Sequence, residues 1–387
     1  MWQNQSMDFK ESAVSQEVRE LARKFAQKEL APLVEKDEHE EKFRPDLIAR
    51  LGEMGLTGVP TAEEWGGAGL GYQEYAAVIE ELAAVSVSYA ISVAVTGLPQ
   101  VILSKFGNAQ QKKRYIPALA SGRAIGSFAL SEAGAGSDAA NLRSTAKRDG
   151  SHYVLNGTKQ WITQADVAET LIVMARTGEP GAKGISAFIL EKGTPGFTLG
   201  KREKKMGCAS SHTMELSFQD ARIRAENLIG AEGQGLKIAL SALDSGRITI
   251  GAAALGIARA ALDCACNHAR IREQFGRPIG EFQGVSFMLA DMATELEAAR
   301  GLVARAAWLR DNEQPYSQQA AMAKLFATDM AMRVTTDAVQ ILGGSGYTQE
   351  FPVERYMREA KVMQIVEGTN QIQRLVIGRG LLQGSTS

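Results

Sequence analysis

The chain has 387 residues, of which 45% are hydrophobic and 22% charged, and its formal net charge at pH 7 is -1. This length exceeds what one hydrophobic core usually covers, so we expect two or three domains. The balanced charge argues against nucleic acid as a partner, because no excess of basic residues is available to neutralise phosphates.

Cysteine and histidine usage argues against two further classes of protein. Only three cysteines occur, and Cys264 and Cys266 lie two apart on a predicted helix, where they point to different faces. A disulfide framework is therefore not expected, and a reducing cytoplasm fits better. The four histidines have no spacing typical of metal ligands, so we predict no metal site.

Membrane and export signals are not expected from the sequence. No uninterrupted run of eighteen apolar residues exists, so we predict no integral membrane association. Residues Met1 to Ser6 are polar and lack the apolar stretch of a signal peptide, and Met7 is an alternative start.

Residues 1–125 are predicted to form an N-terminal α-helical domain. Apolar residues recur at helical spacing from Val18 to Leu30, and Pro45 opens a second helix, where its missing N–H costs nothing. Further helices are expected over 72–84 and 110–119. Pro99 is expected to interrupt the stretch between them.

Residues 126–233 are predicted to form a middle β domain. Asn156-Gly157 is typical of a tight turn, which predicts a hairpin between 153–155 and 158–163. Asp149-Gly150 marks another turn. Several more short apolar runs follow without intervening helices, so we expect a small antiparallel sheet or barrel.

Residues 234–387 are predicted to form a C-terminal four-helix bundle. Apolar positions at steps of three and four from Leu236 to Ala261 predict a long helix of roughly 50 Å at ~1.5 Å per residue. A second seam runs from Leu289 to Ala306, and a third helix should end at Gly343-Gly344. Long helices with short links favour an antiparallel bundle, and their extended apolar faces favour an oligomer.

Two stretches of the middle domain are candidates for a cofactor site. Small residues from Ser131 to Asp138 offer backbone N–H groups suited to a phosphate or a ring carbonyl, with a plain turn as the alternative. Gly134-x-Gly136-x-x-Ala139 matches the dinucleotide-binding fingerprint only loosely, because no βαβ unit surrounds it. Trp161 is either a core residue or a cover for a planar cofactor, with Thr163 offering a hydrogen bond.

Two basic features of the C-terminal part each have two interpretations. Arg247 interrupts an apolar seam, where a charge is costly unless paired, so it makes an ion pair with Asp244 or contacts an anionic or carbonyl ligand. Arg270, Arg272 and Arg277 form either a solvated helix end or a diphosphate clamp.

Glu367 is the candidate catalytic base. It lies between an apolar run and Gly368, and Thr369 is placed to cap the next helix. A carboxylate held against apolar neighbours is a stronger base than one in water, and a base beside N–H donors suits removal of a proton next to a carbonyl. The alternative is a surface glutamate before an ordinary helix.

Five stretches together carry a family resemblance: Phe128–Asp138, Asn156–Thr163, Arg272–Gly276, Gln340–Gly344 and Glu367–Arg374. In this order, over nearly the whole chain, they resemble the acyl-CoA dehydrogenase family of flavoproteins. The resemblance implies a mainly α fold with a central β domain, assembled as a homotetramer (a dimer of dimers). FAD would lie between the β domain and the bundle.

The resemblance also implies site residues. Those implied to bind FAD are Phe128, Leu130, Ser131, Gly136, Ser137, Trp161, Ile162, Thr163, Arg272, Gln274, Phe275, Gln283, Gln340, Ile341, Gly343, Gly344, Thr369, Asn370 and Gln371. Those implied to contact the substrate are Ser137, Asp244, Arg247, Glu367 and Gly368. The adenine-nucleotide half of FAD would be bound partly across a subunit boundary.

The implied reaction is α,β-desaturation of an acyl-CoA thioester to the trans-2-enoyl-CoA. Glu367 would take the α-proton, FAD would accept the β-hydride, and electrons would pass to an electron-transferring flavoprotein. Some family branches carry the base at the position of Gly246, so the pattern here is similar to the short- and medium-chain enzymes. Ala133 and Cys208-Ala-Ser-Ser depart from the usual family pattern.

Rival functions remain at this point. An acyl-CoA oxidase, or a dehydrogenase for branched or aromatic acyl-CoA, would share the scaffold, and a non-catalytic helical scaffold without flavin belongs to another class. The acyl chain length depends on the pocket floor, which we expect between Tyr89 and Pro99.

Overall fold

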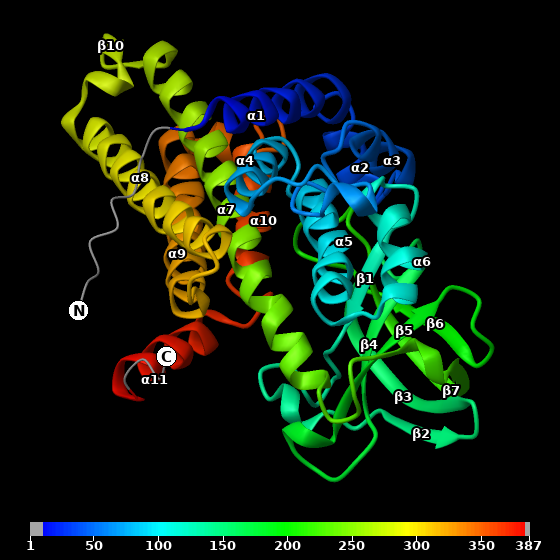
Figure 1. The fold of residues 1–387 in the computed structure, drawn as a ribbon. Coiled ribbons are helices and arrows are strands. Elements are labelled where there is room, and N and C mark those ends of the chain that lie inside the picture. Colours follow the sequence, from blue (N-terminus) through cyan, green and yellow to red (C-terminus); the bar gives the residue numbers. More distant parts are fainter. Residues whose placement is uncertain (1–10, 384–387) are drawn as a thin grey trace.

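The computed structural model describes residues 11–383. The expectations for residues 1–6 and for Met7 lie outside this range. Helices precede and follow a central group of strands (Figure 1), which confirms the predicted fold class.

The N-terminal part is helical, as predicted. Its helices are α1 (Ala13–Phe25), α2 (Val34–His39), α3 (Pro45–Glu53), α4 (Tyr72–Ala83), α5 (Val87–Phe106) and α6 (Ala109–Ala120). A wider π-type turn, Ala26–Leu30, extends α1. Pro45 occupies the first turn of α3, as its fixed backbone angle favours.

Pro99 does not interrupt the helix, which corrects the sequence expectation. It lies inside α5, which continues to Phe106. Most of α5 is buried, and the ring of Pro99 packs so closely on Gly126 that an added Cβ there would lie 2.9 Å away. Tertiary packing on both sides of the proline therefore outweighs the loss of one backbone hydrogen bond.

The central strands form one eight-stranded sheet. The strands are β1 (Gly126–Ala129), β2 (Thr145–Asp149), β3 (His152–Thr163), β4 (Thr170–Arg176), β5 (Ile185–Glu191), β6 (Phe197–Arg202), β7 (Thr213–Arg224) and β8 (Leu228–Ile229). Their order is β6-β7-β3-β2-β4-β5-β8, with β1 on β4. Most pairs are antiparallel, as expected, but β4 pairs in parallel with both β1 and β2.

The predicted turn at Asn156-Gly157 is wrong. Both residues lie within the continuous strand β3, and the register to β7 shifts between Leu155 and Gly157, which marks a bulge. The Asn156 side chain bonds Asp220 across this bulge, at 2.9 Å and 2.8 Å. The actual β2–β3 turn lies at Gly150, where Asp149 pairs with His152.

Long helices form the C-terminal part. They are α7 (Gly235–Ile271), α8 (Gln283–Asp311), α9 (Ser317–Leu342), α10 (Val353–Met363) and α11 (Asn370–Gln383). A short hairpin, β9 (Glu273–Gln274) and β10 (Arg277–Pro278), joins α7 to α8. In Figure 1, α7 runs from the sheet to this hairpin at the opposite end of the bundle.

Two helices, α5 and α7, are long and apolar enough to cross a membrane by length and composition alone. Their most apolar windows are 78% and 72% buried inside the protein. Packing against other parts of the chain therefore accounts for their hydropathy, as in core helices.

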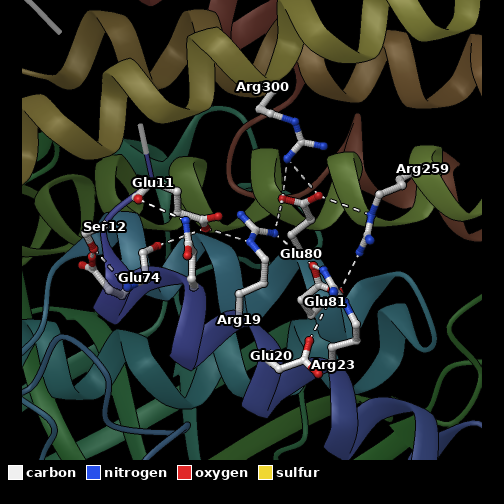
Figure 2. A network of polar contacts seen from close by, with 12 residues as sticks. Glu11, Ser12, Arg19, Glu20, Arg23, Glu74, Glu80, Glu81, Arg259 and Arg300 are labelled. Atoms are coloured by element: carbon white, nitrogen blue, oxygen red, sulfur yellow. Dashed lines mark hydrogen bonds and ion pairs between the residues drawn. The ribbon is translucent and has the colours of Figure 1, made fainter. Parts of the chain in front are cut away.

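An ion-pair network joins α1 to the bundle through α4 (Figure 2). Its centre is Glu80 and Glu81, whose side chains are 4% and 2% exposed. Four arginines from three other helices pair with these carboxylates: Arg19 and Arg23 of α1, Arg259 of α7 and Arg300 of α8. The network therefore links elements far apart in sequence.

Candidate active site

A cavity of about 560 Å³ lies where α5, the sheet, α7 and the loop between α10 and α11 meet. Its lining combines apolar side chains with a few polar groups, which is typical of small-molecule sites. Twelve of the predicted site residues line it: Phe128, Leu130, Ser131, Gly136, Ser137, Trp161, Ile162, Thr163, Arg247, Glu367, Gly368 and Thr369.

Glu367 lies in the α10–α11 loop and presents its carboxyl group to this cavity. Its backbone has a φ of 55°, in the left-handed region that non-glycine residues rarely adopt. The buried Oε2 atom has no hydrogen-bond partner among the described residues. Burial raises the pKa of the carboxyl to about 7, although Arg247 and Lys324 act in the opposite direction. An unpartnered carboxyl with this pKa suits a general base near neutral pH.

Hydrogen bonds hold the Glu367 loop in place. The Gly368 carbonyl accepts from Lys324 Nζ at 2.9 Å and from Gln373 Nε2 at 2.7 Å. Gln373 Nε2 also donates to the Glu367 carbonyl at 3.1 Å. The Thr369 hydroxyl accepts from the Ile372 N–H at 3.3 Å, so Thr369 caps the following helix as predicted.

Arg247 forms the ion pair with Asp244 that was one of its two interpretations from the sequence. It is 4% exposed, its Nη1 atom pairs with Asp244 Oδ1 at 2.6 Å, and it also lines the cavity. Its Nε atom lies 3.5 Å from the Glu367 carbonyl oxygen. The ion pair compensates the burial of the guanidinium and fixes a positive charge beside Glu367.

Gly246 makes room for the base. A Cβ atom at this position would lie 2.5 Å from Glu367 Oε2 and 2.7 Å from its carboxyl carbon. A side chain at position 246 and the carboxyl group of Glu367 would therefore occupy the same space.

The lining from the β domain combines an aromatic side chain with hydroxyl groups. Trp161 lies two residues before the end of β3, with a φ of 60°, and it is 52% exposed, so it is not a core residue. Ser131, Ser137 and Thr163 add hydroxyl groups to the lining. This set of donors and one aromatic face fits a planar heteroaromatic ring such as a flavin.

A buried ion pair supports the loop that carries Ser131. Lys159 is fully buried, and its Nζ donates to Glu132 Oε1 at 2.8 Å and to the Leu130 carbonyl at 3.0 Å. Glu132 also accepts from the Arg143 N–H at 2.6 Å and the Ser144 N–H at 3.0 Å. The Ser131–Asp138 segment is a turn with one isolated bridge. Only a three-residue 3-10 helix, Ala139–Asn141, follows it, in place of the α-helix that a dinucleotide fingerprint requires.

The remaining predicted cofactor residues do not line this cavity. Those of the α7–α8 connection are Arg272, Gln274, Phe275 and Gln283, and those at the end of α9 are Gln340, Ile341, Gly343 and Gly344. Arg272 ends α7, about 37 Å along the helix from Arg247 at ~1.5 Å per residue. Asn370 and Gln371 line a separate polar pocket with Asp329 and Arg374. Within one chain, these predicted cofactor residues are therefore not part of the cavity that contains Glu367.

Several residues that line the cavity are not identifiable from the sequence. Ile91, Val95 and Leu98 come from the stretch expected to form the floor, but only the fold shows which side chains face inward. Lys205, Cys208 and Ser211 also line the cavity, so the stretch that departs from the family pattern at Cys208 lies at the site. Burial raises the pKa of the Cys208 thiol well above its ordinary value.

Comparisons with known proteins find the same family along nearly the whole chain. Family models match the chain in order: acyl-CoA dehydrogenase N-terminal domain over residues 12–123, middle domain over 127–221 and C-terminal domain over 233–382. The short-chain specific acyl-CoA dehydrogenase of Megasphaera elsdenii is 46% identical over 97% of this chain and 100% of its own length.

Solved structures show the same similarity. Butyryl-CoA dehydrogenase from Megasphaera elsdenii superposes with a TM-score of 0.96 at 45% identity, covering 97% of this chain and 100% of the other. A chain solved in work on the electron transferring flavoprotein of Acidaminococcus fermentans gives a TM-score of 0.96 at 48% identity. That match covers 98% of this chain and 100% of the other.

Proposed function

The chain belongs to the acyl-CoA dehydrogenase family, and from this premise we propose that it desaturates a short unbranched acyl-CoA thioester with Glu367 as the base. The observation that carries the proposal is the buried, unpartnered Oε2 atom of Glu367 at an apolar cavity. A carboxyl group in that state has a free lone pair and a pKa near neutrality, as removal of an α-proton requires.

The chain's own groups suit the first half of the reaction. Glu367 takes the α-proton, and its own N–H, which has no acceptor recorded among the described residues, is available to the thioester oxygen. Arg247 and Lys324 supply positive charge near the negative charge that develops. The apolar side chains around the cavity exclude water, which strengthens these interactions.

FAD, when bound, would accept the β-hydrogen with its electron pair. Its ring would be held by Trp161, Thr163 and the Ser131–Ser137 loop, whose exposed aromatic face and hydroxyl groups fit it. The residues predicted to bind the adenine-nucleotide half of FAD lie at the end of the bundle remote from the cavity. We therefore propose that another copy of the chain supplies them in a homotetramer.

The proposal extends to the partner, the location and the domains. We propose an electron-transferring flavoprotein as the electron acceptor, because a similar chain was solved in work on such a protein. We also propose a cytoplasmic location and domain boundaries at 125/126 and 233/234, as expected from composition and periodicity.

The test of this function is Glu367→Gln in the FAD-loaded enzyme with butyryl-CoA. We expect the variant to keep FAD and ligand binding but to lose turnover by at least about a thousandfold, because an amide does not accept the proton as a base. Flavin bleaching follows turnover, and the visible spectrum follows FAD. Desaturation at a near-normal rate would contradict the assignment, and hydrogen peroxide formation in air would indicate an oxidase instead.

A further inference from the structure

Lys324 is a buried cation next to the loop that carries the proposed base. It is 0% exposed on α9, and its Nζ atom donates to the Gly368 carbonyl at 2.9 Å and to Asn370 Oδ1 at 2.8 Å. These acceptors lie immediately after the base, on both sides of Thr369. A buried ammonium group is costly unless it has a compensating role.

The contacts of Lys324 belong to a set that closes the Glu367 loop. The Asn370 N–H donates to the Gln364 carbonyl at 3.0 Å, which joins the two ends of the loop. Asp329, five residues beyond Lys324 on α9, accepts from the side-chain amides of Gln364 and Asn370, each at 2.7 Å. Side chains of α9 therefore hold the loop at several points, and Lys324 is the cation among them.

Charged groups from three helices surround the Glu367 carboxyl and Lys324. Burial lowers the pKa of Lys324 to about 7, Arg247 acts in the same direction, and Glu367 and Asp329 act against it. Each of the other two charges has its own partner: Arg247 of α7 pairs with Asp244 at 2.6 Å, and Arg374 of α11 pairs with Asp329 at 3.1 Å. Lys324 has no carboxylate within ion-pair distance among the described residues.

Gln373 makes it possible to distinguish the effect of the Lys324 charge from the effect of its hydrogen bonds, because Gln373 bonds to the same loop without a charge. Its neutral amide donates to the same Gly368 carbonyl at 2.7 Å and to the Glu367 carbonyl at 3.1 Å. A second side chain therefore donates hydrogen bonds that hold the conformation of the Glu367 loop. Relative to Gln373, Lys324 adds a positive charge and a hydrogen bond to Asn370 Oδ1.

We propose that Lys324 is a positioning residue for the base, whose hydrogen bonds hold the Glu367 turn and whose ammonium charge favours the ionised form of Glu367. This inference rests on the proposed function, in which Glu367 removes the α-proton. On the acid side of neutrality the ammonium form is present, and there it makes loss of the carboxyl proton easier.

The experiment isolates proton removal from hydride transfer. Acetyl-CoA has α-protons but no β-carbon, so exchange of its methyl protons with D2O, followed by NMR on the FAD-loaded enzyme, reports the base alone. The exchange rate is measured from pH 5.5 to 9 for the wild type, Lys324→Met, Lys324→Gln, Gln373→Leu and Glu367→Gln. Flavin content is compared for all five proteins.

The wild-type profile is expected to rise through a midpoint near pH 7, where Glu367 becomes ionised. Both lysine variants should move this midpoint upward by about one pH unit, so that exchange below pH 7 falls about tenfold. Lys324→Gln keeps hydrogen-bond donors without the charge, so it tests the proposal even if the methionine variant does not fold. Gln373→Leu should lower the rate at every pH without moving the midpoint.

An infrared titration of the ligand-free enzyme, with the Glu367→Gln spectrum subtracted, gives a second reading of the same midpoint. Unchanged midpoints in both lysine variants, or an equal shift in Gln373→Leu, would overturn the role of the charge while leaving Glu367 as the base. Exchange that persists in Glu367→Gln would instead remove the base, and this inference with it.

Discussion

At the scale of single residues, the site depends on one glycine and one strained glutamate. Glu367 adopts a left-handed backbone, and its carboxyl fills the space that a side chain at Gly246 would occupy. Helix α7 therefore has no side chain at Gly246, and the space left there is occupied by the Glu367 carboxyl. The glycine matters here for the volume it leaves free, since Gly246 lies within a regular helix.

Gly246→Ala is expected to lower turnover by about a hundredfold, because a displacement of the base by about 1 Å has an effect of that size. The added Cβ would lie 2.5 Å from Glu367 Oε2, so the carboxyl must move. Steady-state turnover with butyryl-CoA is the measurement.

Gly301→Ala is the matched control for this variant. Gly301 also lies inside a helix, α8, but a Cβ there meets nothing within 4 Å. It should leave turnover unchanged and raise stability slightly through helix propensity. Equal losses in both variants would show that the effect is not steric contact with Glu367.

At the scale of elements, the network of Figure 2 attaches α1 to the rest of the protein. Burial by itself would raise the pKa of Glu81, but its bonds to Arg23, Arg259 and Arg19 hold the pKa below its ordinary value. The ionised form is thus favoured by folding. Its contribution to stability is present above the ordinary pKa of 4.5 and is lost as the pH falls below that value.

Glu81→Gln is expected to lower the free energy of unfolding at pH 7 by about 2 kcal/mol, because the amide carries no negative charge and replaces one of the two buried acceptor oxygens by an NH2 donor that faces the arginines. The difference from wild type should shrink as the pH is lowered below 4.5. Thermal unfolding followed by circular dichroism at several pH values measures it.

Glu20→Gln provides the comparison. Glu20 also pairs with Arg23, at 3.2 Å, but its side chain is 46% exposed. Such a pair contributes about 0.5 kcal/mol or less. A loss at Glu20 as large as that at Glu81 would contradict the importance of the buried position.

At the scale of the whole molecule, each chain carries the residues proposed for the flavin ring at one end of the bundle. The residues proposed for the adenine-nucleotide half of FAD lie at the other end. The β9–β10 hairpin lies opposite the sheet (Figure 1), and Phe275 at its tip is 94% exposed. Nearby, Arg277 lies 4.2 Å from the ring centre of Phe282. An aromatic side chain this exposed, beside predicted nucleotide-binding residues, is expected to lie at an interface with another copy.

Phe275→Asp is therefore expected to dissociate the assembly and, at the same time, to reduce FAD retention. Arg272→Ala is expected to reduce FAD retention without changing the assembly. Light scattering after gel filtration gives the mass, and the visible spectrum gives the flavin content. Leu199→Asp, on β6 and 43% exposed, is the control and should change neither. A Phe275→Asp protein of unchanged mass and flavin content would contradict the shared site.

Periodicity and local chemistry alone determined the helix–sheet–helix plan, the C-terminal end of α9, the start of α11 and a candidate base. These features depend on neighbours close in sequence, such as Gly343 after α9 and Thr369 before α11. The wrong expectations at Pro99 and Asn156-Gly157 concern local signals that long-range packing overrides. The partners there, Gly126 and Asp220, lie far away in the sequence.

Only the tertiary structure decided which groups meet at the site. Gly246, Lys324 and Glu367 come from three separate elements, and no sequence spacing relates them. Their meeting follows from the packing of α7 and α9 beneath one loop. That packing buries the carboxyl and its neighbouring cation, and burial is the physical cause of a base with a pKa near neutrality.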